Sequence, residues 1–162
     1  MKFYLCFISL LANFAFFDAS ANTILEGKVV SVADGDTLTV LDNRQTPYKV
    51  RLLGIDAPEK KQAFGEKSKQ SLVELAHGKN VRIVFNKKDK YGRIVGQVFV
   101  GALDICHQQI KSGLAWHYKK YQNEQSIRDR EAYSASEISA QNQQLGLWSD
   151  PRPVAPWDYR NR

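Results

Sequence analysis

The sequence predicts an α+β fold in which a small β-barrel of five strands is combined with three helices. Three short runs rich in β-branched and aliphatic residues lie within residues 26–55, separated by turn-forming residues. A segment with helical spacing of its apolar residues follows, and two more strand-like runs come after it. Three strands, one helix and two strands is the order of a five-stranded OB barrel, in which the helix closes one end.

The first three predicted strands form a meander. Residues 26–32 make the first strand, and the pair Asp34-Gly35 that follows is typical of a tight hairpin turn. Residues 37–41 make the second strand, and a polar turn leads into a third strand that ends at Ile55. Because the second and third strands are neighbours, the start of the former should approach the end of the latter.

The first predicted helix covers residues 64–77 and is stopped by Gly78. Its buried face is expected to hold Ser68, Leu72, Leu75 and Ala76. Residues 81–85 and 94–100 are the fourth and fifth strands, and residues 86–93 form a polar, basic loop between them.

The remainder of the chain is predicted to be mainly helical. Residues 105–112 follow the N-cap Asp104, and their inward side chains are Ile105, Cys106 and Ile110. A third helix covers residues 126–143, and its sparse apolar face is made of Ala132, Ala135 and Ile138. Residues 145–148 then pack back as a hydrophobic latch, and residues 151–162 form a loosely held strap.

The first 21 residues are interpreted as a secretory signal peptide. Lys2 provides a charged start, residues 3–17 are almost wholly apolar, and residues 19–21 match an A-x-A cleavage site. An uncleaved membrane anchor is the alternative. We therefore divide the chain into a leader of residues 1–21 and one domain of residues 22–162. The mature protein should be secreted or periplasmic, with no stable membrane association.

The formal net charge of +6 does not change when the leader is removed, since Lys2 and Asp18 offset one another. A basic exported domain suits a polyanionic partner, which could be nucleic acid, anionic lipid or a cell-wall polymer. Removal of the leader also removes Cys6, so Cys106 is left single and no intramolecular disulfide can form. The three histidines do not have the spacing of zinc ligands, which argues against a zinc or histidine-based enzyme.

The residues best suited to chemistry lie at the end of the third strand. Asp56, the carbonyl of Ala57 and Glu59 bring hard oxygen atoms close to Arg51, a combination that suits a metal ion and a phosphate group. An isolated motif of this kind is more often a strand-end turn with solvated charges. Arg51 and Asp56 would also face opposite sides of a regular strand, so their convergence requires a bulge or twist, which Gly54 can supply.

Two other segments are expected at the same place. Asp36 can approach Asp56, and two carboxylates with one backbone carbonyl form a sparse oxygen site of the kind that Ca²⁺ accepts. In the basic loop, Gly92 allows a bend that presents Arg93, whose planar guanidinium suits phosphate oxygens. Taken alone, Asp36 could merely serve its turn and the loop could be solvated. Together these groups are those needed for metal-assisted attack of water on a phosphodiester.

Three motifs resemble the staphylococcal nuclease-like (thermonuclease) family. They are D-G-D-T at residues 34–37, R-L-L-G-I-D-A-P-E at residues 51–59 and D-K-Y-G-R at residues 89–93. The similarity extends through G-L-A at residues 113–115 and L-W-S at residues 147–149, so it covers nearly all of the predicted domain. The resemblance implies an OB barrel with helices and Ca²⁺-dependent hydrolysis of DNA and RNA that leaves 3′-phosphate ends.

The resemblance also implies a role for individual residues. Asp36, Asp56 and the Ala57 carbonyl correspond to calcium ligands, and Arg51 and Arg93 correspond to the phosphate-binding pair. Glu59 corresponds to the proposed general base, which either takes a proton or mainly orients water. Substrate contacts are expected from Lys90, Tyr91 and Tyr121, while Tyr118 is offset by one position and Tyr91 could instead simply pack.

Two positions depart from the pattern of the family's best-known member. Ala57 stands where that member has threonine, which keeps the ligating carbonyl but loses the hydroxyl. The segment after Glu59 is shorter than its flexible loop, so loop contacts to substrate cannot be transferred.

The resulting hypothesis is an exported, monomeric, calcium-dependent nuclease that acts on single-stranded or locally opened DNA and RNA with little sequence preference. The alternatives are a non-catalytic OB module that binds nucleic acid and a basic protein that binds anionic envelope polymers.

Overall fold

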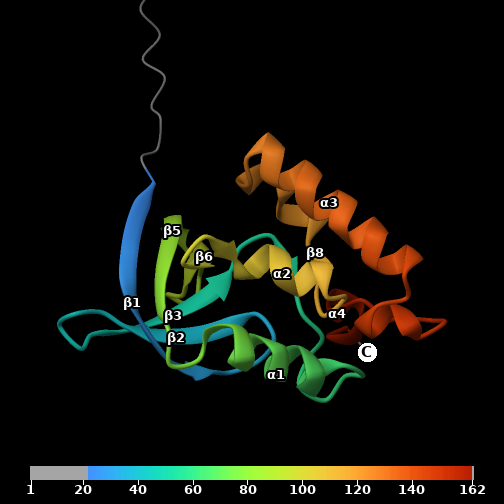
Figure 1. Cartoon of the computed structure of the whole chain (residues 1–162), viewed down its shortest axis with the longest axis horizontal. Coiled ribbons are helices and arrows are strands. Elements are labelled where there is room, and N and C mark those ends of the chain that lie inside the picture. Colours follow the sequence, from blue (N-terminus) through green and yellow to red (C-terminus); the bar gives the residue numbers. More distant parts are fainter. Residues whose placement is uncertain (1–21, 162) are drawn as a thin grey trace, which may run out of the picture.

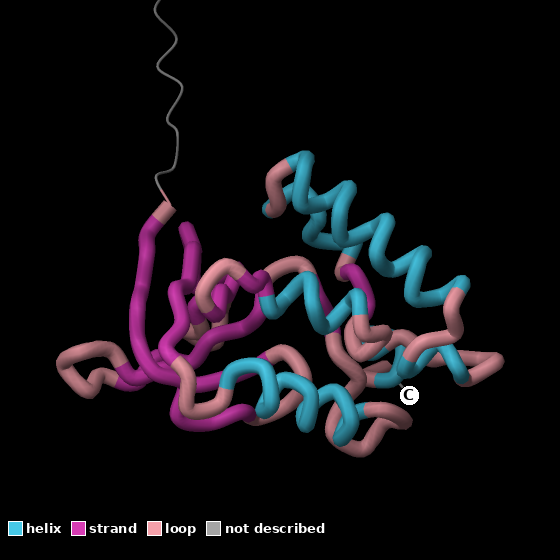
Figure 2. Tube along the Cα trace, viewed as in Figure 1, coloured by secondary structure: helices cyan, strands magenta, loops and turns pink. Residues whose placement is uncertain are grey.

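The computed structural model of the chain describes residues 22–161, so the predicted signal peptide and Cys6 lie outside the described residues. Five strands form the barrel: β1 (Thr23–Val32), β2 (Thr37–Leu41), β3 (Pro47–Leu52), β5 (Asn80–Lys88) and β6 (Ile94–Val100). They follow the order β3-β2-β1-β5-β6, and β3 also pairs in parallel with β6, which closes the sheet on itself (Figures 1 and 2). The predicted five-stranded OB barrel is therefore confirmed.

Helices, 3₁₀ turns and three short strands complete the fold around the barrel. The helices are α1 (Gly65–Ala76), α2 (Ile105–Lys111), α3 (Ile127–Asn142) and the short α4 (Pro156–Tyr159), with 3₁₀ turns η1 (Lys119–Glu124) and η2 (Gly146–Ser149). The short strands are β4 (Ile55–Asp56), β7 (Leu103–Asp104) and β8 (Trp116–His117). Figure 1 shows the barrel strands gathered on one side of the molecule, α2 and α3 on the other, and the C-terminal end close to α4. Among residues 22–161, no helix has both the length and the apolar character that crossing a membrane would require.

Aliphatic side chains from alternating strand positions fill the barrel. Val29, Leu38, Val40, Val50, Ile83 and Val98 are fully buried. Leu72 and Ala76 of α1 join the same core, as do Ile105, Cys106 and Ile110 of α2. The predicted inward face of α2 is correct, and Asp104 caps this helix as expected, because its side chain accepts a hydrogen bond from the backbone N–H of His107.

Two strand boundaries differ from the prediction. The third strand ends at Leu52 instead of Ile55, because residues 53–54 form a turn and Ile55–Asp56 pairs with Trp116–His117 as a separate two-stranded sheet. The fourth strand extends to Lys88, with an irregularity in its pairing between Phe85 and Lys87. The basic loop is correspondingly shorter than predicted.

The predicted apolar face of the third helix is wrong. Its buried side chains are Tyr133, Glu137 and Ala140, while Ile138 is 52% exposed. The Tyr133 hydroxyl donates to Asp104 Oδ2 at 2.7 Å, and Glu137 Oε1 accepts from the backbone N–H of His117 at 2.9 Å. Polar contacts therefore orient this helix, and the spacing of its apolar residues does not reveal them.

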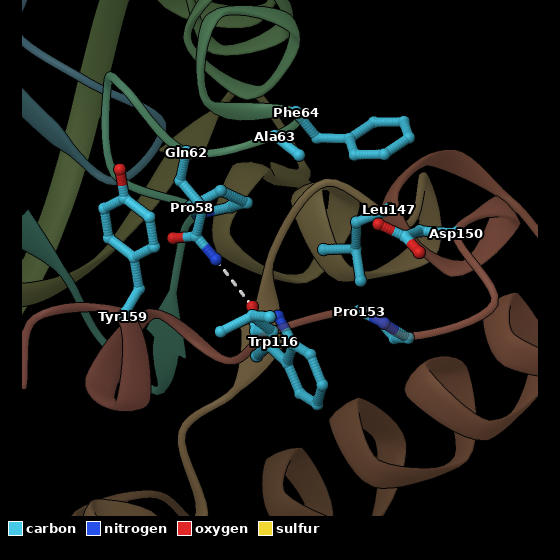
Figure 3. Close-up of a pocket in the computed structure, with 10 residues that line it drawn as sticks. Pro58, Gln62, Ala63, Phe64, Trp116, Leu147, Asp150, Pro153 and Tyr159 are labelled. Atoms are coloured by element: carbon cyan, nitrogen blue, oxygen red, sulfur yellow. Dashed lines mark hydrogen bonds between the residues drawn. The ribbon is translucent and has the colours of Figure 1, made fainter. Parts of the chain in front are cut away.

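The C-terminal tail is packed, which corrects the expectation of a loosely held strap. Gln62 Nε2 donates to the carbonyl of Val154 at 2.6 Å, and Ala155 and Pro156 are buried. Figure 3 shows this hydrogen bond within a small pocket of about 190 Å³, whose lining includes Trp116 and residues of the tail. The tail therefore lies against the segment that follows Glu59 and against the predicted latch, whose Leu147 and Trp148 are buried as expected.

Candidate active site

The guanidinium of Arg51 joins the two aspartates that were expected to meet. Arg51 Nη1 lies 2.6 Å from Asp36 Oδ2, and Nη2 lies 2.8 Å from Asp56 Oδ1. The register of the barrel explains the contact, because Thr37 pairs with Arg51 across β2 and β3, which places Asp36 beside it. Both aspartates are buried, so this cluster forms a charged floor under the protein surface.

Gly54 provides the change of direction that Arg51 and Asp56 require. It has a φ of +76° in the turn between β3 and β4, a conformation that is strained for residues with a Cβ. The carbonyl of Gly54 accepts a hydrogen bond from the backbone N–H of Tyr118 at 2.9 Å, which fixes the turn against the start of η1. The sequence-based expectation that Gly54 makes these side chains converge is confirmed.

The turn at residues 34–36 is held against α1 and α2. A Cβ on Gly35 would lie 1.9 Å from Ser68 Oγ, so only glycine permits this approach. Gln109 Nε2 also donates to the carbonyl of Gly35 at 2.8 Å. Gly35 does not adopt a positive φ, so its role differs from the predicted one. It allows close packing of the turn and thereby fixes the position of Asp36.

The oxygen atoms of this floor fit a divalent cation by their chemistry. The backbone N–H of Ala57 donates to Asp36 Oδ2 at 2.7 Å, so Ala57 lies directly beside both carboxylates. Burial and the neighbouring charge of Asp36 raise the pKa of Asp34 to about 6. Burial raises the pKa of Asp56 as well, although the hydrogen bonds from Arg160 and the charge of Arg51 oppose that shift. A hard cation would offset this concentration of buried negative charge.

No three His, Cys, Asp or Glu side chains of residues 22–161 are grouped so that they alone could hold a metal ion. The predicted donor set has a different composition, because it combines two carboxylates with one backbone carbonyl. Such a set leaves several coordination positions to water or substrate, which calcium tolerates. The roles of Asp36, Asp56 and Ala57 as ligands stay predictions.

Glu59 lies at the edge of the same floor and has an unexpected partner. Its backbone N–H donates to Gln62 Oε1 at 3.0 Å, and its side chain is 39% exposed. Arg160 Nη1 donates to Glu59 Oε1 at 2.7 Å, and Arg160 Nη2 donates to Asp56 Oδ2 at 2.8 Å. Sequence reasoning missed Arg160 because it treated the tail as a loose strap and found no motif there.

Arg93 reaches the site from the basic loop. Gly92 has a φ of +78°, and Asp89 organises the bend by accepting hydrogen bonds from the backbone N–H groups of Tyr91 and Arg93. Asp89 Oδ2 also accepts from Arg93 Nε at 2.7 Å, which leaves the two terminal nitrogens of Arg93 without a hydrogen bond among residues 22–161. Tyr91 is 73% exposed, so it does not pack into the protein, and its ring lies close to Lys90 and Arg93.

A single cleft of about 740 Å³ brings these groups together. Its lining includes every residue to which the sequence assigned a role, namely Asp36, Arg51, Asp56, Ala57, Glu59, Lys90, Tyr91, Arg93 and Tyr121. Tyr118 and Arg160 line it as well. Tyr121 is 42% exposed and lies edge-on to Tyr118, with 5.0 Å between ring centroids. The cleft thus has a buried charged floor and a rim with exposed aromatic and basic side chains.

The three histidines and Cys106 make no such cluster. His77 contacts the carbonyl of Val30, His107 contacts Ser136, and His117 contacts Gln125. Cys106 is buried in the barrel core, where burial raises the pKa of its thiol. These side chains serve packing and local hydrogen bonding.

The fold and the cleft define an OB-fold protein whose buried carboxylates lie beside guanidinium groups suited to phosphate. Residues 49–150 match the family described as "Staphylococcal nuclease homologue". The chain is 39% identical over 154 residues to an uncharacterized endonuclease of Haemophilus influenzae, covering 95% of this chain and 83% of that protein. It is 39% identical over 143 residues to the micrococcal nuclease of Shigella flexneri, covering 83% and 79%. The chain therefore belongs to the staphylococcal nuclease-like family.

Proposed function

We propose that this protein is a calcium-dependent nuclease that hydrolyses phosphodiester bonds of DNA and RNA with little sequence preference. The observation that carries the proposal is the bridge made by Arg51 between Asp36 and Asp56 on the floor of the cleft. The guanidinium that we propose to bind phosphate is therefore in contact with both carboxylates that we propose to bind the metal. The nuclease names of the relatives and the family membership support the same reaction.

In this proposal Asp36, Asp56 and the carbonyl of Ala57 hold the calcium ion. Bound calcium would offset the negative charge of the phosphate and the additional charge that builds up on its oxygens as water attacks phosphorus. Burial raises the pKa of Asp56 and so penalises its charge, and a bound cation would offset that penalty. The neighbouring Thr37 hydroxyl, which donates to Asp36 Oδ1 at 3.1 Å, keeps the Asp36 carboxylate oriented.

In the same proposal Arg51, on the floor of the cleft, and Arg93, from the basic loop, bind the phosphate. Burial alone would lower the pKa of Arg51, but the charges of Asp36, Asp56 and Asp34 outweigh burial, so its net pKa shift is upward and it stays protonated. Arg51 Nη1 is buried and has no aligned hydrogen-bond acceptor among residues 22–161, although it is ion-paired with Asp36. The terminal nitrogens of Arg93, which make no hydrogen bond among residues 22–161, are available to phosphate oxygens, and Arg51 lines the same cleft.

Glu59 acts on the attacking water. Its partly exposed carboxylate can accept the proton of a water molecule in the cleft, or orient that water, as its oxygen attacks phosphorus. The bond from phosphorus to the 5′ oxygen then breaks, and the 5′ oxygen leaves with a proton from solvent or from the protein. The products are a 3′-phosphate end and a 5′-hydroxyl end.

The test is the release of acid-soluble nucleotides from single-stranded DNA and from RNA. Activity should appear with calcium and disappear with EDTA. The DNA products should resist extension by a polymerase until a phosphatase removes the 3′-phosphate. Binding of nucleic acid without cleavage in the presence of calcium would instead support a non-catalytic OB module, and binding only to anionic polymers of the envelope would contradict both.

We also propose that the protein is exported and acts as a monomer in the periplasm or outside the cell. The charged start, the apolar run and the A-x-A site of residues 1–21 support export. The N-terminal sequence of the mature protein should begin at or near Asn22. A mature form that still begins with Met1 would contradict export through a cleaved signal peptide.

A further inference from the structure

Arg160 contributes a second guanidinium to the floor of the cleft. Its Nη2 lies 2.8 Å from Asp56 Oδ2, and its Nη1 lies 2.7 Å from Glu59 Oε1 and 3.3 Å from Asp56 Oδ1. Arg51 already contacts Asp56 Oδ1. Both oxygens of Asp56 are therefore engaged by cationic side chains, one of which belongs to the C-terminal tail.

The fold delivers Arg160 to this position. The tail is anchored by the hydrogen bond from Gln62 to Val154 and by burial of Ala155 and Pro156. Trp157 stacks on Tyr118 with 5.3 Å between ring centroids and an interplanar angle of 6°. Arg160 follows within one helical turn, where its backbone N–H donates to the carbonyl of Pro156 at 3.0 Å. These contacts hold the backbone of the tail in place up to Arg160.

The guanidinium itself is free to exchange its partners. The Arg160 side chain is 41% exposed, whereas that of Arg51 is only 14% exposed. A long side chain with an exposed end can turn into solvent while its backbone stays in place. Arg51 is enclosed by the floor, so Arg160 is the cation that can leave Asp56.

Repulsion between the carboxylates of the cleft explains why a cation is favourable at the position of Arg160. Four carboxylates, those of Asp34, Asp36, Asp56 and Glu59, line the cleft around these two arginines. Like charges this close repel one another, and a cation that contacts two of them lowers that repulsion. A calcium ion held by Asp36 and Asp56 would relieve the same repulsion and would use the same oxygens. The ion and the guanidinium are therefore competitors.

We propose that Arg160 is a resident counter-cation of the calcium site. In the protein without calcium, Arg160 holds Asp56 and Glu59, and calcium displaces it from Asp56 on binding. This inference rests on the proposed calcium centre and adds a residue that sets how much calcium the centre requires. Arg160 acts through Asp56 and Glu59, so it is a positioning residue.

The test compares calcium binding to the whole exported protein and to its variant Arg160→Gln by isothermal titration calorimetry without substrate. Loss of the competing ion pair should tighten calcium binding by about fivefold, the size expected for a partly exposed ion pair. Arg152→Gln is the matched control. Arg152 is an exposed arginine of the same tail, and its replacement changes the net charge equally, so calcium affinity should remain close to that of the unmodified protein.

A second readout is the melting temperature. In EDTA, Arg160→Gln should melt at a lower temperature than the unmodified protein, because its carboxylates lose a counter-cation. The difference should shrink at saturating calcium, while a purely structural role of Arg160 would leave the same difference in both conditions. If Arg160→Gln did not fold, Arg160→Lys would take its place. Lysine keeps the charge but lacks the two guanidinium nitrogens that contact Glu59 and Asp56, so calcium binding should again be tighter, by less than in Arg160→Gln.

Calcium binding of unchanged or weaker affinity in the Arg160 variant would overturn the inference and leave the calcium centre standing. If the unmodified protein and the variant both failed to bind calcium, the proposed calcium centre itself would be contradicted, and the inference would fall with it. The two failures are therefore distinguishable in one set of titrations.

Discussion

The carboxylates of the cleft differ in burial and in partners, and these differences assign them different tasks. Asp36 and Asp56 are buried beside Arg51, where a charge is costly without a counter-ion. Glu59 is partly exposed, and among the charged groups of residues 22–161 it forms a salt bridge only with Arg160. Metal binding and activation of water should therefore be separable by mutation.

We expect Asp36→Asn and Asp56→Asn to raise the calcium concentration needed for cleavage, because each removes a formal charge from the proposed metal site. Glu59→Gln keeps the size of the side chain but cannot accept a proton. It should lower the maximal rate on the order of 10²–10⁴-fold even at saturating calcium, the usual contribution of general acid–base catalysis. A calcium titration of the cleavage rate for all three variants measures both effects.

Circular dichroism of each variant is the control for folding. If Glu59→Gln shifted only the calcium requirement and regained the full rate at saturation, the role proposed for Glu59 would be wrong. If none of the three substitutions impaired cleavage, the reaction would have to take place elsewhere on the molecule.

Sequence motifs made it possible to predict each central residue of the site. Contacts between these residues could be predicted only where the partners lie close together in the sequence or on neighbouring strands. Asp56 and Glu59 lie within a few residues of Arg51, and β2 lies beside β3, so their meeting could be inferred locally. Arg160 contacts residues that are 101 and 104 positions earlier in the chain. Residue spacing in the sequence cannot predict a contact over that distance. The packing of Ala155 and Trp157 in the folded protein is what brings Arg160 to the cleft.

The elements were predicted best where a repeating pattern of burial defines them. The barrel strands and α2 bury aliphatic side chains at regular intervals, and their positions were correct to within a few residues. The helix α3 was placed correctly, but its orientation was not, since Tyr133 and Glu137 are buried for their polar contacts. An apolar period cannot reveal a face that is fixed by hydrogen bonds to distant elements.

The junction of β8 with α3 should make stability depend on pH through His117. Its side chain is buried and contacts Gln125 Oε1 at 2.8 Å. Burial lowers the pKa of His117 below the ordinary value of a histidine, and the charges of Lys119 and Arg130 act in the same direction. The hydrogen bond to Gln125 and the charge of Glu137 oppose this shift without reversing it.

His117 therefore binds a proton more readily in the unfolded chain than in the folded protein. The free energy of unfolding should fall as the pH drops below about 6.5, where the unfolded imidazole becomes protonated. His117→Gln should flatten this part of the profile, as measured by urea denaturation between pH 5 and 7.5. His77→Gln, at an exposed position, is the control and should keep the shape of the original curve. An unchanged slope in His117→Gln would show that other groups carry the effect.

On the scale of the whole molecule, the charges are separated between the floor and the rim of the cleft. The protein carries a net charge of +6, yet the floor of the cleft holds the buried carboxylates of Asp36 and Asp56. Lys87, Lys90 and Arg93 come from the same strand and loop and line the cleft above that floor. A polyanion would meet the basic rim first, while the acidic floor stays available for a cation.

This arrangement predicts that binding to nucleic acid weakens steeply with salt. Each phosphate that a basic side chain neutralises releases counter-ions, so the logarithm of affinity should fall linearly with the logarithm of salt concentration, with a slope of about −0.7 per phosphate for a single strand. Lys90 lines the cleft, so Lys90→Gln should reduce the slope by about one phosphate contact. Lys49 is exposed on β3 and does not line the cleft, so Lys49→Gln should leave the slope unchanged.

Fluorescence anisotropy of a labelled single-stranded phosphorothioate oligonucleotide, which resists cleavage, measures the affinity of all three proteins over a salt series. A response that does not change with salt would contradict recognition through phosphate, and equal slopes for the two variants would place the binding track outside this cleft.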